Sequence, residues 1–155
     1  MAAWTAPQEV HDLAFRYALA VDRRDADMLL SVFTEDGAVL GYGENPISFR
    51  AEAGLRDMTE KLAIFRMTMH NVFNQTFNMD ADGQLTGETN CIASHILPGD
   101  AWRVMDMAIR YHNSYRQQGG SWRFLERRLE VLWVETRSVS PFVPSMMKDD
   151  LGDFV

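Results

Sequence analysis

Residues 17–29 read YALAVDRRDADML, and the spacing of their apolar positions predicts the end of one helix and the start of another. Asp22 interrupts the apolar first half of this stretch. Residues three, four and seven apart share a helix face, so Asp22 is expected beside Leu19, Ala18 and Phe15. A carboxylate on a core-facing side is costly unless it has a partner. The stretch therefore predicts a helix pair and a partner for Asp22.

Around this stretch, the N-terminal half of the chain has the pattern of helices, and the C-terminal half has the pattern of strands. Helical spacing predicts a first helix from Pro7, a short second helix capped by Asp25, and a third helix over residues 48–65. TEDG is expected to form a turn, and residues 38–43 a short strand. Four later runs predict an antiparallel meander: residues 67–79, 85–97, 101–117 and 122–137. This order favours an α+β fold.

Composition narrows the classes of function. The chain has 155 residues, a length typical of one domain, and 22 acidic against 15 basic residues, for a net charge of −7. This charge disfavours a nucleic-acid partner. The single cysteine, Cys91, excludes an intrachain disulfide and a cysteine-based metal site. We expect no signal peptide, no membrane span and a cytoplasmic location.

Alternation along the long strands sorts their side chains onto two faces. The faces expected under the helices carry several polar residues among apolar ones: Thr68, His70, His95, Tyr111, Asn113 and Arg127, with Val72 and Trp133 beside them. Polar groups that converge in an apolar cavity are typical of a small-molecule site. The opposite faces carry Phe73, Phe77, Leu132 and Val134, which predict a homodimer or homotrimer contact through the sheet.

Three segments carry a resemblance to a known family. FRYALAVDRRDADMLLSVFTEDG, RMTMHNVFNQ and RYHNSYRQQGGSWRFLERRLEVLW resemble motifs of the SnoaL-like branch of the nuclear-transport-factor-2-like superfamily. The resemblance spans roughly residues 8–134 and implies a single domain over 1–155. It implies a cone in which three N-terminal helices pack on a strongly curved, mainly antiparallel sheet. The tail, residues 138–155, is expected to cover the pocket or a neighbouring subunit.

The resemblance also implies a site and a reaction. Scytalone dehydratases of this branch pair an aspartate on the first helix with a histidine on the first long strand. That pattern implies Asp22 and His70, and further features of members of this fold imply His95, Tyr42 and Tyr17 as the other catalytic residues. Neutral His70 is expected to be the general base, and Asp22 to fix its tautomer. The implied activity is elimination from a small cyclic or aromatic hydroxy compound, without cofactor or metal.

Further positions are expected to hold the substrate rather than react with it. These substrate-binding candidates are Tyr111, Asn113, Arg127, Thr68, Val72 and Trp133. Tyr17, Tyr42 or Tyr111 is expected to donate a hydrogen bond to a substrate carbonyl, and His95 to protonate a departing hydroxyl. Arg127 is expected to hold an anionic or phenolic part of the substrate. Asp22, His70 and His95 also have residue types that ligate metals.

Each of these residues also has a structural interpretation. Asp22 is compatible with a cap or a salt bridge to a neighbouring arginine, and His70 with a core histidine. His95 lies near a strand end, Tyr42 lies between two glycines, and Arg127 is compatible with an ion pair. The functional alternatives are the non-catalytic β subunit of an aromatic-ring-hydroxylating dioxygenase, an isomerase or cyclase of the same fold, and a binding module.

Overall fold

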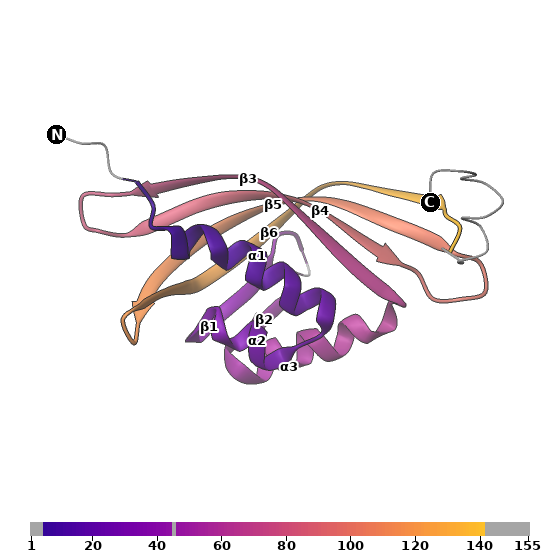
Figure 1. The fold of residues 1–155 in the computed structure, drawn as a ribbon, viewed down its shortest axis with the longest axis horizontal. Helices are drawn as coiled ribbons and strands as arrows, with labels where there is room; N and C mark the ends of the chain where they lie inside the picture. The colour runs from indigo at the N-terminus through magenta and orange to yellow at the C-terminus, as the bar shows by residue number, and fades with distance from the viewer. Residues whose placement is uncertain (1–4, 45, 142–155) are drawn as a thin grey trace, which may run out of the picture.

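Helix α1 (Gln8–Arg23) packs across the concave side of a curved sheet in the computed structural model, which describes residues 5–44 and 46–141 (Figure 1). Its buried stripe includes Val10, Leu13, Tyr17 and Val21, at the spacing of a helix face. The side chain of Asp25 accepts a hydrogen bond from the backbone of Met28 and begins helix α2 (Ala26–Ser31). The predicted helix pair is therefore confirmed.

Asp22 lies at the border of this buried stripe rather than within it. Ala18 is buried, but Phe15 is 50% exposed and Leu19 is 41% exposed. The expectation that all three share a core-facing side with Asp22 is therefore wrong for Phe15 and Leu19. A helix face spans about 100° of arc, so residues three to seven apart can straddle its edge. From that border the Asp22 carboxylate points toward Thr68 and His70, near the start of the edge strand of the sheet.

The sheet has six strands in the order β2-β1-β6-β5-β4-β3, so it is open, with β2 and β3 at its edges. The strands are β1 (Phe33–Gly41), β2 (Ser48–Arg50), β3 (Met67–Met79), β4 (Leu85–Ile96), β5 (Arg103–Gln118) and β6 (Ser121–Ser138). Strands β3 to β6 form the predicted antiparallel meander, and β1 joins β6 in parallel. The α+β prediction is confirmed, with helices on one side of the sheet (Figure 1).

Two local predictions in the N-terminal half are wrong. TEDG does not turn the chain but lies inside β1, where the register with β6 shifts between Phe33 and Ala38. Residues 48–50 form β2 instead of the first turn of a helix, because they pair with the outer edge of β1. Helix α3 (Ala51–Lys61) follows and tightens into a 3₁₀ turn, Leu62–Ile64. None of the helices in the described ranges combines the length and apolarity that crossing a membrane requires.

Bulges reverse the alternation of side chains at three points in the long strands. The register of β3 on β4 shifts between Val72 and Gln75, and β6 carries an extra residue at Leu125 and at Leu132. Each extra residue moves all later side chains to the other face. Phe77 therefore packs against the core near Tyr115, not on the outer face as predicted. The predicted oligomer contact through the outer face stays a prediction.

Trp133 is the site candidate that these bulges displace. Trp133 pairs with Ala108, whereas Val131 pairs with Ile109 on the cavity side. The extra residue Leu132 therefore places Trp133 and Val131 on opposite faces of the sheet. Trp133 is 50% exposed and does not line the cavity described below. Its predicted place beside Arg127 is wrong, because strict alternation ignored the extra residue at Leu132.

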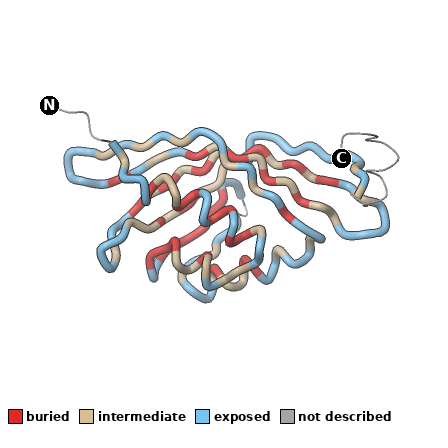
Figure 2. Tube along the Cα trace, viewed as in Figure 1, coloured by how far each residue is buried: buried red, intermediate tan, exposed pale blue. Residues whose placement is uncertain are grey.

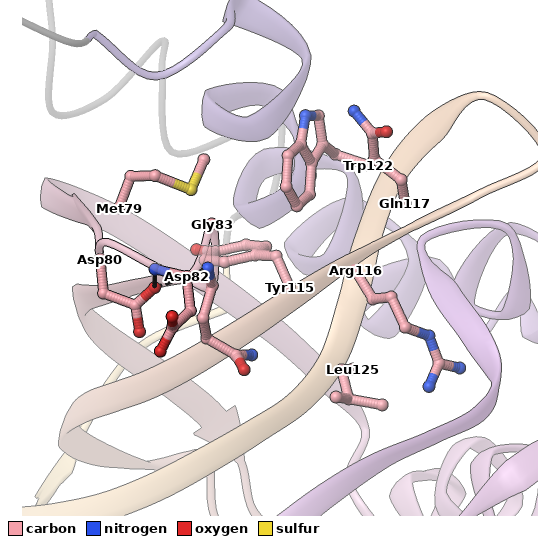
Figure 3. A pocket seen from close by; sticks show the side chains of 10 residues that line it. Met79, Asp80, Asp82, Gly83, Tyr115, Arg116, Gln117, Trp122 and Leu125 are labelled. Carbon is pink, nitrogen blue, oxygen red and sulfur yellow. Dashed lines mark hydrogen bonds between the residues drawn. The ribbon is translucent and has the colours of Figure 1, made fainter.

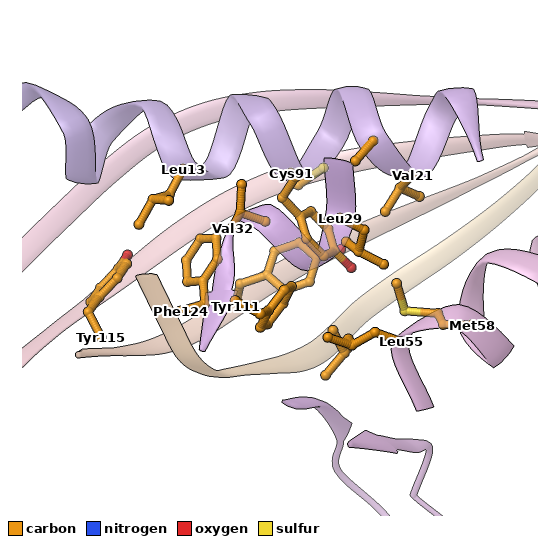
Figure 4. Packing of buried hydrophobic residues seen from close by; sticks show 14 of the residues in the cluster. Leu13, Val21, Leu29, Val32, Leu55, Met58, Cys91, Tyr111, Tyr115 and Phe124 are labelled. Carbon is orange, nitrogen blue, oxygen red and sulfur yellow. The ribbon is translucent and has the colours of Figure 1, made fainter. Parts of the chain in front are cut away.

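The core lies between α1 and the middle of the sheet. Leu13 and Val21 reach from α1 toward the aromatic rings of Tyr111 and Phe124, and Leu55 approaches from α3 (Figure 4). Burial is concentrated in this central region, while the hairpin ends are exposed (Figure 2). A fully buried side chain of this kind contributes about 1.5–3 kcal/mol, so this packing fixes α1 on the sheet.

Candidate active site

A cavity of about 470 Å³ lies between the sheet and the segment formed by α3 and the 3₁₀ turn. Much of its wall is apolar, with side chains such as Val39, Phe49, Met58, Leu62, Phe65 and Ile109. The polar and aromatic side chains that line it are Tyr17, Tyr42, Lys61, His70, His95 and Tyr111. An apolar cavity with few polar groups suits a small organic ligand.

Asp22 and His70 meet at this cavity although they are 48 residues apart in the chain. The Nδ1 atom of His70 lies 2.7 Å from Oδ1 of Asp22, and the backbone N–H of His70 donates to Oδ2 at 2.9 Å. Thr68 donates to the same Oδ1 atom at 2.8 Å. The side chains are 6% exposed for His70 and 21% for Asp22. With Nδ1 bound to Asp22, Nε2 is the free nitrogen of the ring.

This arrangement answers the burial problem of Asp22. Burial alone raises the pKa of its carboxyl. The side-chain and backbone hydrogen bonds from His70 and the hydrogen bond from Thr68 lower that pKa by more than burial raises it. The net pKa lies below the ordinary value of 3.8, so Asp22 is a carboxylate near neutral pH. A carboxylate at Nδ1 requires the proton on that nitrogen and leaves Nε2 as a lone-pair acceptor.

The lowered pKa of Asp22 makes part of the folding stability pH-dependent. Its contribution is present above the unfolded-state pKa, near 3.8, and is lost as the pH falls through the lower folded-state pKa. We therefore expect Asp22→Asn to reduce the free energy of unfolding at pH 7 and to narrow that deficit below about pH 4. Urea unfolding of both proteins across this range measures it. An equal deficit at pH 3 and pH 7 contradicts the assignment.

Thr68 supports the carboxylate rather than the substrate. It is buried and its hydroxyl hydrogen bonds to Asp22, and it does not line the cavity. We expect Thr68→Val to cost about 1.5–3 kcal/mol of unfolding free energy, the usual value of a hydrogen bond to a charged group. Turnover should fall by less than about tenfold, because both His70 contacts remain. Denaturation and kcat measure both effects, and Thr86→Val on an exposed part of β4 is the matched control.

His95 lies next to His70 on the neighbouring strand. The two rings are 5.8 Å apart at an angle of 78°, and the ring of Phe65 covers His95 at 4.6 Å. Burial lowers the pKa of His95, and the nearby His70 lowers it further. His95 is therefore a neutral imidazole at neutral pH, able to hydrogen bond to a ligand in the cavity.

Tyr17 and Tyr111 form the wall of the cavity that faces the core. Their ring centroids are 5.9 Å apart in an edge-to-face arrangement. Burial raises the pKa of Tyr17, which Arg127 partly offsets, and burial raises the pKa of Tyr111 well above its ordinary value. Both phenols are therefore protonated at neutral pH.

Arg127 and Asn113 lie behind this wall, not on the cavity surface. Arg127 is 1% exposed, and its guanidinium carbon lies 3.9 Å from the ring centroid of Tyr111. Asn113 accepts a hydrogen bond from Arg127 and donates one to Thr89. Val72 also does not line the cavity. His70, His95, Tyr17 and Tyr111 thus line the cavity, and Asp22 contacts His70 from behind the lining. Asn113, Arg127, Val72 and Trp133 lie outside the lining.

Tyr42 lies at the rim of the cavity and is 57% exposed. Its ring packs at 5.9 Å from the ring of His112 and 5.5 Å from the guanidinium of Arg128. His112 and Arg128 alternate with Tyr111 and Arg127, so they lie on the opposite face of the sheet. The ring of Tyr42 therefore packs against residues of the outer face at the rim of the cavity, and its role as a donor to the substrate stays a prediction.

Sequence reasoning missed the residues that close the cavity from the helical side. Lys61, at the end of α3, lines the cavity, pairs with Asp57 at 2.6 Å and lies 5.4 Å from the ring of Phe49. Lys61 follows Met58 by three positions, so the two share a helix face. That spacing was visible in the sequence, but nothing local showed that α3 folds over the sheet.

A second hollow of about 590 Å³ lies at the ends of the hairpins, away from the histidines. Met79 and the turn residues Asp80, Asp82 and Gly83 border one side, and Tyr115 and Trp122 the other (Figure 3). It contains no histidine, so it does not offer the base that the smaller cavity has. Within the described ranges, no three His, Cys, Asp or Glu side chains are grouped to hold a metal, and Asp22, His70 and His95 form no such group.

Comparisons with known proteins agree with the fold. The family model described as a SnoaL-like domain matches residues 3–128. A hexachlorocyclohexane dehydrochlorinase from Novosphingobium barchaimii LL02 aligns with a TM-score of 0.73 and 16% identity over 88% of this chain and 93% of that one. A protein from Novosphingobium aromaticivorans DSM 12444, provisionally named a scytalone dehydratase, aligns with a TM-score of 0.71 and 18% identity over 88% and 89%.

A third structure widens the range of activities on this fold. A protein from the same Novosphingobium aromaticivorans strain, provisionally named an aromatic ring hydroxylase, aligns with a TM-score of 0.70 and 24% identity over 87% of this chain and 96% of that one. A search of curated proteins finds no match. At these identities the structural likeness shows a shared fold and leaves the reaction to the residues of the cavity.

Proposed function

Since the chain belongs to the SnoaL-like domain family, we propose that it is a cofactor-free lyase that eliminates water or another small leaving group from a small cyclic hydroxy compound. The observation that carries this proposal is the 2.7 Å contact between Nδ1 of His70 and Oδ1 of Asp22 at the wall of a largely apolar cavity. A histidine oriented by a carboxylate, with its other nitrogen free, is a general base.

The proposed reaction starts when Nε2 of His70 removes a proton from a carbon next to a carbonyl. The electron pair of that C–H bond moves onto the carbonyl oxygen and gives an enolate, while the imidazolium is stabilised by Asp22. The enolate then re-forms the carbonyl and expels the leaving group from the neighbouring carbon. Because His95 is neutral, the imidazolium of His70 supplies the proton that a departing hydroxide needs.

Tyr17 and Tyr111 supply the hydrogen bonds for the enolate oxygen in this proposal. Both phenols are protonated at neutral pH, and both line the cavity that His70 lines. Donors that are already in place when charge develops lower the barrier and raise kcat, typically by a factor of about 10²–10³ per donor. The apolar remainder of the cavity suits a ring compound.

Two other functions make different predictions for the same cavity. An isomerase would use the same base but return the proton to another carbon, so no leaving group would be released. The other alternative is a structural β subunit beside a ring-hydroxylating oxygenase; one structure of the same fold is provisionally named an aromatic ring hydroxylase. A structural subunit has no use for a carboxylate-oriented histidine at a largely apolar cavity, so the dyad favours catalysis.

The proposal is tested by incubating the protein with a panel of hydroxylated and halogenated cyclic ketones without added cofactor. Mass spectrometry of the products separates loss of water or halide from isomerisation, which leaves the mass unchanged. Elimination by the wild-type protein that disappears in the His70→Gln variant supports the lyase. Elimination that persists at the wild-type rate in this variant removes its basis.

A further inference from the structure

Arg127 is a buried cation without a carboxylate partner among the described residues. It is 1% exposed, and its guanidinium carbon lies 3.9, 4.4 and 4.8 Å from the ring centroids of Tyr111, Tyr17 and Phe124. Its guanidinium donates a hydrogen bond to Asn113 at 3.2 Å, and its Nε atom has no partner within the described part of the chain. The next residue, Arg128, instead pairs with Glu126 on the other face.

Burying a cation without a counter-charge is costly, and aromatic faces offset only part of that cost. The carboxylate of the site, Asp22, hydrogen bonds with His70 and Thr68 and does not pair with Arg127. Two of the three rings around Arg127, those of Tyr17 and Tyr111, also line the cavity. The positive charge therefore lies directly behind the wall that the ligand touches.

We propose that Arg127 is a positioning residue that keeps this tyrosine wall electropositive, so that the cavity selects compounds that place a negatively charged oxygen against Tyr17 and Tyr111. Such compounds are phenolates and the enolates of cyclic ketones. This inference rests on the proposed function and names its substrate class: a ring compound with a carbonyl next to the carbon that His70 deprotonates. A halide or alcohol without that carbonyl gains nothing from the wall.

The geometry separates this role from direct contact with a substrate anion. Arg127 does not line the cavity, and the tyrosine rings lie between its guanidinium and the ligand. A substrate carboxylate therefore cannot reach it. The cation acts through the two phenols, whose hydrogen bonds to an anionic oxygen strengthen in its field. Consistent with that field, Arg127 acts to lower the pKa of both phenols against the effect of burial.

The probe for this proposal is 4-nitrophenol, a ring compound that titrates near neutral pH and is yellow only as the phenolate. Titrating it against the wild-type protein at a pH where it is mostly neutral in water reports the ionisation state of the bound form. We expect the bound probe to be the phenolate, with its pKa at least about one unit below that in water. A wild-type protein that binds only the neutral phenol, or does not bind the probe, overturns the proposal.

The variant Arg127→Met removes the charge and keeps a long side chain among the rings. We expect it to raise the pKa of the bound probe by about one unit or more and to weaken phenolate binding by about tenfold. Arg128→Met makes the same change one residue later, outside the cavity, and should leave both quantities unchanged. Tyr17→Phe should shift the bound probe in the same direction as Arg127→Met. An unchanged spectrum in folded Arg127→Met overturns the proposal, and the wild-type measurement decides it if that variant does not fold.

The same probe separates this inference from the proposed function. His70→Gln removes the base, so it abolishes elimination, but the phenolate signature of the probe should persist because the wall is intact. If the signature disappears with His70, the histidine and not Arg127 ionises the probe, and the inference fails while the lyase stands. If His70→Gln retains elimination, the lyase proposal fails whatever the probe shows.

Discussion

His70→Gln should reduce kcat for elimination by about 10²–10⁴ while the protein remains folded. This range is the usual contribution of a positioned general base. Glutamine retains a side-chain N–H that can donate to Asp22, so the substitution removes the basic Nε2 atom without leaving the carboxylate unpaired. The measurement is single-turnover and steady-state kinetics on the substrate found in the panel, with the thermal unfolding midpoint recorded for each protein.

A matched control exists on the opposite face of the sheet. His112 also contacts carboxylates, with Nε2 at 3.0 Å from Glu130 and Nδ1 at 3.3 Å from Glu88, but it does not line the cavity. His112→Gln removes the same chemical group and should leave kcat within about twofold, since most surface changes have small effects. Equal losses in the two variants would mean that the effect comes from the fold and not from the base.

Asp22→Asn should reduce kcat by about 10³–10⁴, as the loss of the orienting carboxylate does in other histidine-based sites. Asp22 accepts three hydrogen bonds: from Nδ1 and the backbone N–H of His70, and from Thr68. An amide has one acceptor oxygen, and its NH₂ group faces a donor at one of these contacts. If the amide donates to Nδ1, the imidazole proton moves to Nε2, and the free nitrogen is no longer a base.

The control for this variant is Asp106→Asn. Asp106 is also a buried carboxylate, and it accepts from Ser94 and Arg137, but it lies on the outer face of the sheet. It should lose stability without a specific loss of kcat. The two variants therefore separate the general cost of a lost carboxylate from its role in orienting His70. Turnover by Asp22→Asn within tenfold of the wild type is incompatible with the dyad.

Sequence patterns predicted correctly several features that depend on neighbouring residues in the chain. The cap at Asp25, the buried stripe of α1 and the four strands of the meander follow from spacing along the chain. The strand alternation also predicted the cavity-facing positions of His70, His95 and Tyr111. Alternation failed at Phe77 and Trp133, because a bulge is fixed by how a strand pairs with its neighbour.

The sequence by itself determined the order of elements, the α+β class and, through its resemblance to a family, the residue types that meet at the site. Only the tertiary structure decided that Thr68 holds Asp22, that the ring of Tyr42 turns to the outer face, and that Arg127 lies behind Tyr17 and Tyr111. Each of these contacts joins residues from different elements. Its geometry depends on bulges, on sheet curvature and on how α1 packs across the strands, and no short stretch of sequence encodes these.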